Sequence, residues 1–337
     1  MNNKSFERII LVADNTPGEG APDDLFNRDS DKAQSENVTA LFKALKVISK
    51  EVILYDSLEK FTHNTASHIN DLVFPYWHGE RSRNKQALVA SVCEAAGIKY
   101  IGADTYTNIV CCDKVLAKEI CRMSGLLVPQ SITIRKPIKS RDLPTLRYPI
   151  LVKPNYEGSS IGITQDNIFW KEDPDRLQDM VNNLYNNLGV PILIEEFIAG
   201  REVSISIVGW RDNIKAWGAV ERYSEENKHY FETFLHSHED KINNTILLRD
   251  AKNLLDNATM INVFNLFDAL DKVEYIRIDG KMTADGFYCF ELSHDTTLDP
   301  EGAFFKALSF SGCNYQNAVN LIIANCLERY SSLYPNQ

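Results

Sequence analysis

The sequence predicts a mixed α/β protein built from several sub-domains. In the first hundred residues, apolar strand-like runs alternate with helical patterns, which is typical of a parallel sheet covered by helices. Beyond residue 190, strand patterns joined by short turns predominate, which predicts antiparallel hairpins. The 337 residues are too many for one compact core, so two or three sub-domains are expected.

The N-terminal part begins with a buried-strand pattern over residues 8–13. A polar stretch with prolines and glycines follows over 14–31, and its length predicts a binding loop or a mobile flap. The next predicted elements are a helix from Ser35 to about 47, strands over 51–55, 71–77 and 98–102, and a helix over 86–96. Because ligands of parallel sheets lie at the carboxyl ends of the strands, the 14–31 stretch and His78 fall at a candidate site.

The remaining two thirds of the chain begin with one predicted helix over 107–125, which Gly125 and Pro129 end. The later predicted strands are 131–134, 148–153, 191–209 (with a turn inside it), 216–220, 273–279 and 287–292. The later predicted helices are 174–188, 249–269, 302–310 and 315–330. The segment 223–245 has weak periodicity and is predicted to be a mobile loop.

Composition excludes several classes of partner. The net charge of −10 argues against nucleic acid or anionic membranes, since both require clustered positive charge. No apolar run of about 18 residues and no signal-peptide pattern is present, so we expect neither a membrane span nor secretion. The seven cysteines are scattered, which indicates a cytoplasmic location without a disulfide framework. Cys111 and Cys112 are expected to be buried small residues rather than a redox pair.

The segment from Lys153 to Ile163 combines a strand end, a lysine and a loop of small residues. Gly158, Ser159 and Ser160 allow a backbone to approach a bulky anion, and their N–H and hydroxyl groups can point at phosphate oxygens. The alternative is an ordinary glycine-containing hairpin with an exposed lysine. Other motifs must therefore decide between these two interpretations.

Carboxylates elsewhere in the chain favour the phosphate interpretation. The relevant residues are Glu195, Glu196 and Glu202 around one strand-turn-strand, and Asp279 and Glu291 at facing ends of a later hairpin. Paired carboxylates on neighbouring strands beside a phosphate loop form a Mg²⁺ site that substrate phosphates complete. This constellation suits phosphoryl transfer, in which metal and lysines balance the charge of the phosphates.

Taken in order, these motifs resemble the ATP-grasp ligases of the D-alanine–D-alanine ligase type. The resemblance runs from about His78 to Arg329. It is carried by Lys153-Pro-x-x-Glu-Gly-Ser-Ser-Ile-Gly-Ile, Glu195-Glu-Phe-Ile-Ala-Gly-Arg-Glu202, Arg277-Ile-Asp279 and Phe290-Glu291, in the order that the family keeps. It implies an ATP-grasp fold with three sub-domains and a nucleotide between the last two: an N-terminal α/β domain over 1–110, a central domain over 111–190 and a C-terminal domain over 191–337.

The resemblance also implies roles for individual residues, with ATP and Mg²⁺ (or Mn²⁺) as cofactors. The implied nucleotide contacts are Lys114 and Lys153 at the phosphates, the loop residues Glu157, Gly158, Ser159 and Ser160, Glu195 at the adenine amino group, Glu196, Phe197 and Ile198 around the base, and Glu202 at the ribose. The implied metal ligands are Asp279, Glu291 and Ser293. The implied catalytic residues are Arg277 at the oxyanion, Ser160 at the substrate, and Glu36 and His78 at the first amino acid.

Three departures from the family pattern concern the substrate. Ser293 stands where the family has asparagine as its third metal ligand, so Asp295 or His294 is a candidate replacement. The family's serine-proline-glycine turn is absent, and Asp299-Pro-Glu-Gly takes its place. The loop 223–245 lacks the expected lysine and tyrosine pair, so His236 is the candidate near the γ-phosphate.

Several alternatives stay open at this point. Arg277 could form an ion pair with Glu291, and His78 could be a histidine at a domain seam. His229, His236 and His238 resemble a transition-metal cluster, although no partner motif has ligand spacing.

The predicted function is an ATP-dependent carboxylate–amine ligase, which joins an amino-acid or carboxylate substrate to an amine acceptor through an acyl phosphate. The alternatives are a nucleotide-binding module with altered catalysis and a small-molecule kinase on the same fold. No nucleic acid or membrane partner is expected, and a homodimer is an expectation from the family.

Overall fold

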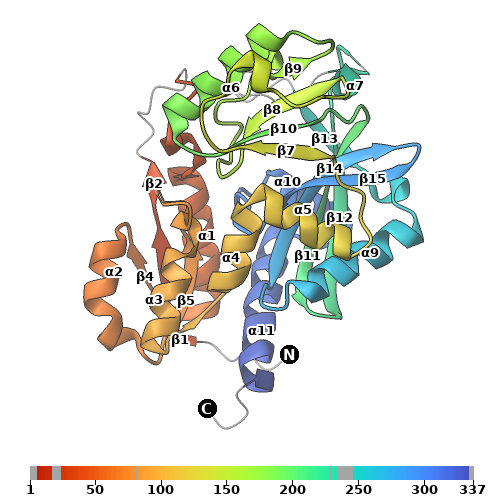
Figure 1. Ribbon diagram of the computed structural model, residues 1–337. Coiled ribbons are helices and arrows are strands. Elements are labelled where there is room, and N and C mark those ends of the chain that lie inside the picture. The colour runs from red at the N-terminus through yellow and green to blue at the C-terminus, as the bar shows by residue number, and fades with distance from the viewer. Residues whose placement is uncertain (1–5, 17–23, 80–81, 228, 234–245, 334–337) are drawn as a thin grey trace.

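The computed structural model describes residues 6–16, 24–79, 82–227, 229–233 and 246–333. Three main sheets organise the described chain, and each lies in a different region with its own helices (Figure 1). The first sheet is parallel and the other two are antiparallel. The predicted mixed α/β class is therefore confirmed.

The N-terminal sheet is the parallel one. In spatial order its strands are β4 (Ser49–Tyr55), β1 (Phe6–Ala13), β5 (Leu72–Tyr76) and β6 (Lys99–Tyr100). The helices of this region are α1 (Ser35–Ile48), α2 (Leu58–Asn64) and α3 (Leu88–Ala96). Ile9 and Leu11 of β1 belong to one apolar cluster, whereas Ile10 and Val12 belong to another. Both faces of this strand are covered, which explains its unbroken apolar sequence.

The central sheet contains β7 (Ser131–Ile134), β10 (Ile192–Glu196), β8 (Ile150–Pro154) and β9 (Ile168–Phe169), in spatial order. Helix α6 (Pro174–Leu188) packs on it through Leu177, Val181 and Leu184, which lie one turn apart. Strand β10 pairs with β7 and β8, so a boundary between residues 190 and 191 would divide this sheet. A boundary after β10 follows the pairing better, and the division into three sub-domains remains our proposal.

The C-terminal sheet is the largest. Its strands are β13 (Leu247–Asp250), β12 (Asn213–Tyr223), β11 (Arg201–Trp210), β14 (Tyr275–Thr283) and β15 (Gly286–Ser293), in spatial order. The helices of this part are α7 (Tyr230–Thr233), α9 (Asn257–Ala269), α10 (Ala303–Phe310) and α11 (Tyr315–Leu333). Tyr275, Phe304 and Ile322 join the apolar cluster that contains Ile9 of the N-terminal sheet. A shared core therefore connects the two ends of the chain.

Two predicted helices differ from the structure. The single helix predicted over 107–125 is two helices, α4 (Thr105–Cys112) and α5 (Lys114–Met123). Asp113 between them is extended, and its carboxylate accepts a hydrogen bond from the Val115 N–H at 3.0 Å, so it caps α5. The helix predicted to begin at residue 249 begins at Asn257, because residues before it form β13 and Asp256 is the cap.

The smaller elements complete the description. Strand β2 (Asn15–Thr16) lies within the polar stretch 14–31 and pairs with β3 (Ala33–Gln34), which follows it. The stretch also contains a 3₁₀ turn, Arg28–Asp31. Within the described part of the chain, no helix has the length and apolar character needed to cross a bilayer.

Candidate active site

A cavity of about 390 Å³ is lined by residues of both the central and the C-terminal sheet. Its volume lies in the range of small-molecule binding sites. Eleven of the predicted nucleotide contacts line it: Lys114, Lys153, Glu157, Gly158, Ser159, Ser160, Glu195, Glu196, Phe197, Ile198 and Glu202. We call it the large cavity. The structure thus brings together residues that are up to 88 positions apart (Lys114 to Glu202).

The loop after β8, residues 155–163, has an unusual backbone. Ser159 (φ 49°) and Ser160 (φ 59°) both adopt the left-handed region, which residues other than glycine seldom occupy. A Cβ atom on Gly158 would lie 2.5 Å from a carboxylate oxygen of Asp31, so a larger residue there would require the Asp31 side chain to move. This glycine-serine loop therefore packs directly against the N-terminal part of the chain.

A buried carboxylate joins two lysines beside the loop. The Nζ atoms of Lys153 and Lys118 lie 2.5 Å and 2.7 Å from the two carboxylate oxygens of Glu195. Burial alone would raise the pKa of Glu195, but the two ammonium groups outweigh it and lower the pKa. Burial lowers the pKa of Lys153, and Glu195 opposes that effect. If Glu195 contacted the adenine of a bound nucleotide, its carboxylate would therefore have to serve both lysines as well.

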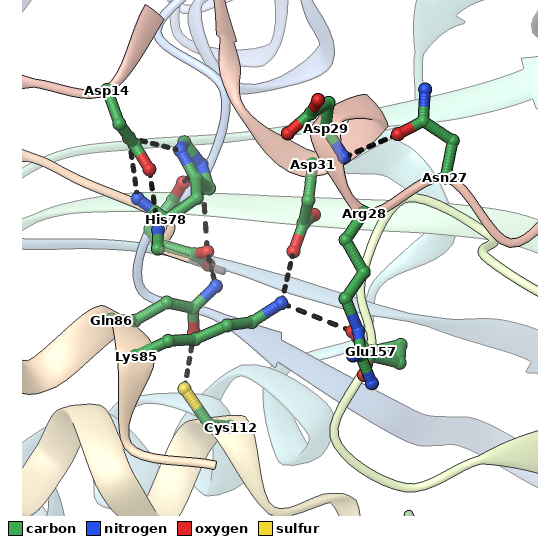
Figure 2. A network of polar contacts seen from close by, with 12 residues as sticks. Asp14, Asn27, Arg28, Asp29, Asp31, His78, Lys85, Gln86, Cys112 and Glu157 are labelled. Carbon is green, nitrogen blue, oxygen red and sulfur yellow. Dashed lines mark hydrogen bonds and ion pairs between the residues drawn. The ribbon is translucent and has the colours of Figure 1, made fainter. Parts of the chain in front are cut away.

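A second carboxylate, Glu157, ties the loop to the N-terminal part (Figure 2). The Nε and Nη2 atoms of Arg28 donate to its Oε1 at 3.0 Å and 2.8 Å, and Lys85 Nζ donates to its Oε2 at 3.2 Å. Lys85 also lies 3.4 Å from the Asp31 carboxylate. We call Arg28, Asp31, Lys85 and Glu157 the Glu157 cluster. Its contacts occupy the Glu157 carboxylate, which was predicted to serve the cofactor.

The backbone of Glu157 contacts a second lysine, Lys114, which lines the large cavity. Its carbonyl accepts a hydrogen bond of 2.7 Å from Lys114 Nζ. Burial alone would lower the pKa of Lys85, but Asp31 and Glu157 outweigh it and raise the pKa, so Lys85 is a cation at neutral pH. One residue of the loop is therefore held by three cations from distant segments.

The predicted metal carboxylates lie opposite one another. Asp279 of β14 and Glu291 of β15 are direct partners in the antiparallel register. Glu291 Oε1 lies 3.1 Å from Lys114 Nζ, and the Asp279 carboxylate accepts hydrogen bonds of 2.8 Å and 2.9 Å from Arg277. Burial alone would raise the pKa of Asp279, but Arg277 outweighs it and holds the pKa far below its usual range. Arg277 thus pairs with Asp279 rather than with Glu291.

These residues fit a hard divalent cation by their chemistry. Ser293 donates its hydroxyl to Asp279 Oδ2 at 3.1 Å, so Asp279, Glu291 and Ser293 offer oxygen atoms only, which suit Mg²⁺ or Mn²⁺. If such a cation were bound, phosphate oxygens and water would have to supply its remaining ligands. Among the described residues, no group of three or more histidine, cysteine or acidic side chains could hold a metal ion.

Lys281 is a site residue that the sequence analysis missed. It follows Arg277 and Asp279 at every second position of β14, and all three line the large cavity. Alternate residues of a strand lie on one face, so the spacing of Lys281 from Arg277 and Asp279 was the feature of the sequence that could have predicted it as a site residue. Its Nζ donates a hydrogen bond of 2.5 Å to the carbonyl of Phe231 in α7 and lies 4.7 Å from the centre of the Phe197 ring.

A second cavity of about 80 Å³ adjoins the first and is lined mainly by polar side chains. The two cavities share the wall residues Lys114, Glu157, Gly158, Ser159, Arg277, Glu291 and Thr297. We call it the small chamber. His78 lines it, together with Asp31, Gln86 and Asp295.

His78 is buried between two aspartates (Figure 2). Its Nε2 lies 3.7 Å from the Asp295 carboxylate, and its Nδ1 lies 3.8 Å from the Asp14 carboxylate. Burial alone would lower the pKa of His78, but Asp14, Asp295 and Asp31 outweigh it and raise the pKa to about 9. The ring is therefore an imidazolium at neutral pH. Asp295 is directed to His78 and Gln86, which leaves Ser293 as the residue beside Asp279.

Other predicted site residues lie elsewhere or outside the described chain. Glu36 is exposed on the first turn of α1 and lines neither cavity. His236 and His238 of the suggested histidine cluster lie outside the described residues, and His229 pairs with Glu232 at 2.7 Å. The acidic side chains that line the small chamber are instead Asp31, Glu157, Glu291 and Asp295.

Comparison with known proteins agrees with this geometry. A family model described as "D-ala D-ala ligase C-terminus" matches residues 121–324, more than half of the chain. The chain belongs to this family. The matched range includes the glycine-serine loop, Glu195 and Glu196, and the hairpin of Asp279 and Glu291.

The individual proteins that resemble this chain are distant from it in sequence. The uncharacterized protein y4sG of Sinorhizobium fredii is 25% identical over 283 residues, which cover 82% of this chain and 81% of that protein. The vancomycin B-type resistance protein VanB of Enterococcus faecalis is 33% identical over 144 residues, 43% of this chain and 40% of that protein. The crystal structure of D-alanine–D-alanine ligase from Bacillus anthracis complexed with ATP superimposes with a TM-score of 0.71 at 18% identity, covering 97% and 99% of the two chains. The predicted ATP-grasp fold is confirmed.

Proposed function

We propose that this protein is an ATP-dependent ligase that joins a small carboxylate to an amine with formation of an amide bond. The observation that carries the proposal is the pair of adjoining cavities, one large and one small, with Arg277, Lys114 and Glu291 in their common wall. Membership in the D-ala D-ala ligase family supports it, and so does the likeness to a ligase that was solved with ATP.

The large cavity is the proposed ATP site, and its charge argues for a metal ion. Its lining carries seven carboxylates (Glu157, Glu195, Glu196, Glu202, Asp279, Glu291 and Asp299) and five cationic side chains (Lys114, Lys153, Arg222, Arg277 and Lys281). Glu157 and Glu195 are paired with Arg28, Lys85 and Lys118, which lie outside this lining. The carboxylates beside the phosphates would therefore be Asp279 and Glu291, and a divalent cation would offset their repulsion of a triphosphate. Asp279, Glu291 and Ser293 would hold Mg²⁺ or Mn²⁺, which neutralises charge on the phosphates when bound.

The first proposed step is phosphoryl transfer at the common wall. A carboxylate oxygen of the substrate in the small chamber attacks the γ-phosphorus, the bond from this phosphorus to the β-bridging oxygen breaks, and ADP leaves. Lys114 and Lys153 would hold the phosphates, and the glycine-serine loop would cover them. The product of this step is an acyl phosphate, whose carbonyl carbon is now susceptible to an amine.

The second proposed step is attack of the amine on that carbon. The negative charge that develops on the carbonyl oxygen needs a fixed donor, and Arg277 is the proposed donor because it lines both cavities. Collapse of the tetrahedral intermediate breaks the bond from carbon to the phosphate oxygen and leaves the amide, and the departing phosphate takes up the proton that the amine loses. The guanidinium of Arg277 has its pKa raised by Asp279 against the effect of burial, so it remains charged throughout.

The small chamber limits the substrates. A polar space of about 80 Å³ that is lined by Asp31, Asp295 and the imidazolium of His78 suits a compact zwitterion, such as a small amino acid, better than an apolar ligand. His78 would face the carboxylate of such a substrate and Asp31 its ammonium group. The cytoplasmic location and the homodimer remain predictions.

The test is ADP release measured with Mg²⁺, ATP and a panel of amino acids and amines, with products identified by mass spectrometry. Substrate-stimulated ADP together with an amide product is the expected result. ADP with a phosphorylated product and no amide would support the kinase alternative. ATP binding without stimulated ADP for any pair would support the module with altered catalysis.

A further inference from the structure

The strand face that carries Arg277, Asp279 and Lys281 lies along the length of the large cavity. These residues are spaced by two positions on β14, so their side chains follow one another at intervals of roughly 7 Å. Arg277 lines both cavities, whereas Asp279 and Lys281 line only the large one. The row therefore leads away from the small chamber, and Lys281 is at its far end.

The order of these residues indicates which end of the nucleotide would lie at which end of the large cavity. This step rests on the proposed function. The transferred phosphoryl group must meet a substrate in the small chamber, which places it near Arg277 and the common wall. The phosphates then occupy the stretch beside Asp279, and the nucleoside occupies the end of the cavity where Lys281 lies.

The surroundings of Lys281 agree with a nucleoside at that end. Lys281 is directly opposite Glu202 of β11 in the antiparallel register, and its ammonium group lies over the ring of Phe197, which follows β10. Both neighbours line the large cavity, and Lys281 itself is only 4% exposed. A buried ammonium group between a carboxylate and an aromatic face is a fixed donor rather than a solvated surface charge.

The same ammonium group reaches a third element. It donates to the carbonyl oxygen of Phe231, a buried residue of α7, at 2.5 Å. Lys281 thus joins the strand, the segment after β10 and α7 at one end of the cavity. A ligand that contacts this ammonium group is also placed against α7.

We propose that Lys281 is a nucleoside-binding residue, which donates a hydrogen bond to an oxygen or nitrogen acceptor of the ribose or base and positions α7 against that part of the ligand. Lys114 and Lys153 then serve the phosphates, and Lys281 serves the other end of the same molecule. A contact with the nucleoside distinguishes the role of Lys281 from that of a lysine that only attracts phosphate by its charge.

The experiment compares Lys281→Met and Lys281→Arg with the parent protein by titration with ADP, adenosine and inorganic tripolyphosphate in Mg²⁺. A charged hydrogen bond contributes enough that Lys281→Met should weaken ADP and adenosine binding by about tenfold or more. Tripolyphosphate affinity should be unchanged, and Lys281→Arg should recover most of the lost affinity. Lys252→Met is the matched control, since Lys252 also lies over an aromatic ring, at 4.2 Å from Trp217, but lines neither cavity.

The outcomes separate this inference from the proposed function. Unchanged ADP and adenosine affinity in Lys281→Met, or an equal loss of tripolyphosphate affinity, would overturn the inference while leaving an ATP site in place. If the parent protein binds neither ADP nor ATP, the proposed function fails first. Thermal unfolding of each variant shows whether it is folded, and Lys281→Gln gives the same comparison if Lys281→Met is not.

Discussion

Replacing Lys85 with methionine is the sharpest test of how the glycine-serine loop is held. Methionine keeps the unbranched shape of the side chain, one atom shorter, and removes its charge. Lys85 is 5% exposed, and its ammonium group lies 3.2 Å from Glu157 and 3.4 Å from Asp31. Lys85→Met therefore leaves two buried carboxylates with one cation fewer.

The magnitude follows from burial and from the partners that remain. Breaking a buried ion pair by removing one partner typically costs about 3–5 kcal/mol. Arg28 continues to compensate Glu157, and its side chain is 28% exposed, so water also reaches that pair. We therefore expect Lys85→Met to lower the free energy of unfolding by about 2–3 kcal/mol, below the full range.

The assay is urea unfolding of the parent, Lys85→Met, Glu157→Gln and the double variant. A cluster that acts together should give a coupling energy of about 1 kcal/mol or more between the two positions. The control is Lys60→Met, because Lys60 pairs with Asp56 at 2.8 Å but both side chains are more than half exposed. Its loss should cost less than about 0.5 kcal/mol.

The reasoning about the Glu157 cluster would be refuted by either of two results. One is a change in Lys85→Met no larger than that in Lys60→Met. The other is simple additivity of Lys85→Met and Glu157→Gln, which would mean that the contacts in Figure 2 contribute independently.

Three further predictions concern the large cavity. Asp279→Asn should lower ADP release by about a hundredfold or more and weaken its dependence on Mg²⁺, and unchanged kinetics would remove Asp279 from the metal site. Arg277→Met should lower kcat by a similar factor with little change in nucleotide affinity, and a change confined to KM would contradict the oxyanion role. Glu195 has a lowered pKa in the folded state because Lys153 and Lys118 outweigh burial, so its stabilisation is present above the unfolded pKa of about 4.3 and is lost as pH falls. Glu195→Gln should therefore be less stable than the parent at pH 7 in urea unfolding, with a difference that shrinks toward pH 3, and a constant difference would contradict the pairing.

Local pattern was sufficient for most of the elements. The buried strand over 8–13, the helix over 174–188 and the hairpin of Asp279 and Glu291 were predicted within a few residues, because their apolar periodicity is strong. The boundary at Asp113 was missed, since an aspartate inside an apolar helical pattern gives no sign that it will act as a cap. The short helix α2 was missed for a related reason, as seven residues provide too little periodicity.

The sequence by itself determined the family, the fold and most of the charged side chains that gather at the large cavity, although not Lys281, because the motifs and their order can be read along the chain. It could not determine how those side chains pair. That Glu195 bridges two lysines, that Asp279 is held by Arg277 and that Glu157 meets Arg28 and Lys85 depends on distances between segments up to 129 residues apart. Only the tertiary structure brings those charges within a few ångströms of one another, where the Coulomb energy and the loss of water decide which partner each carboxylate takes.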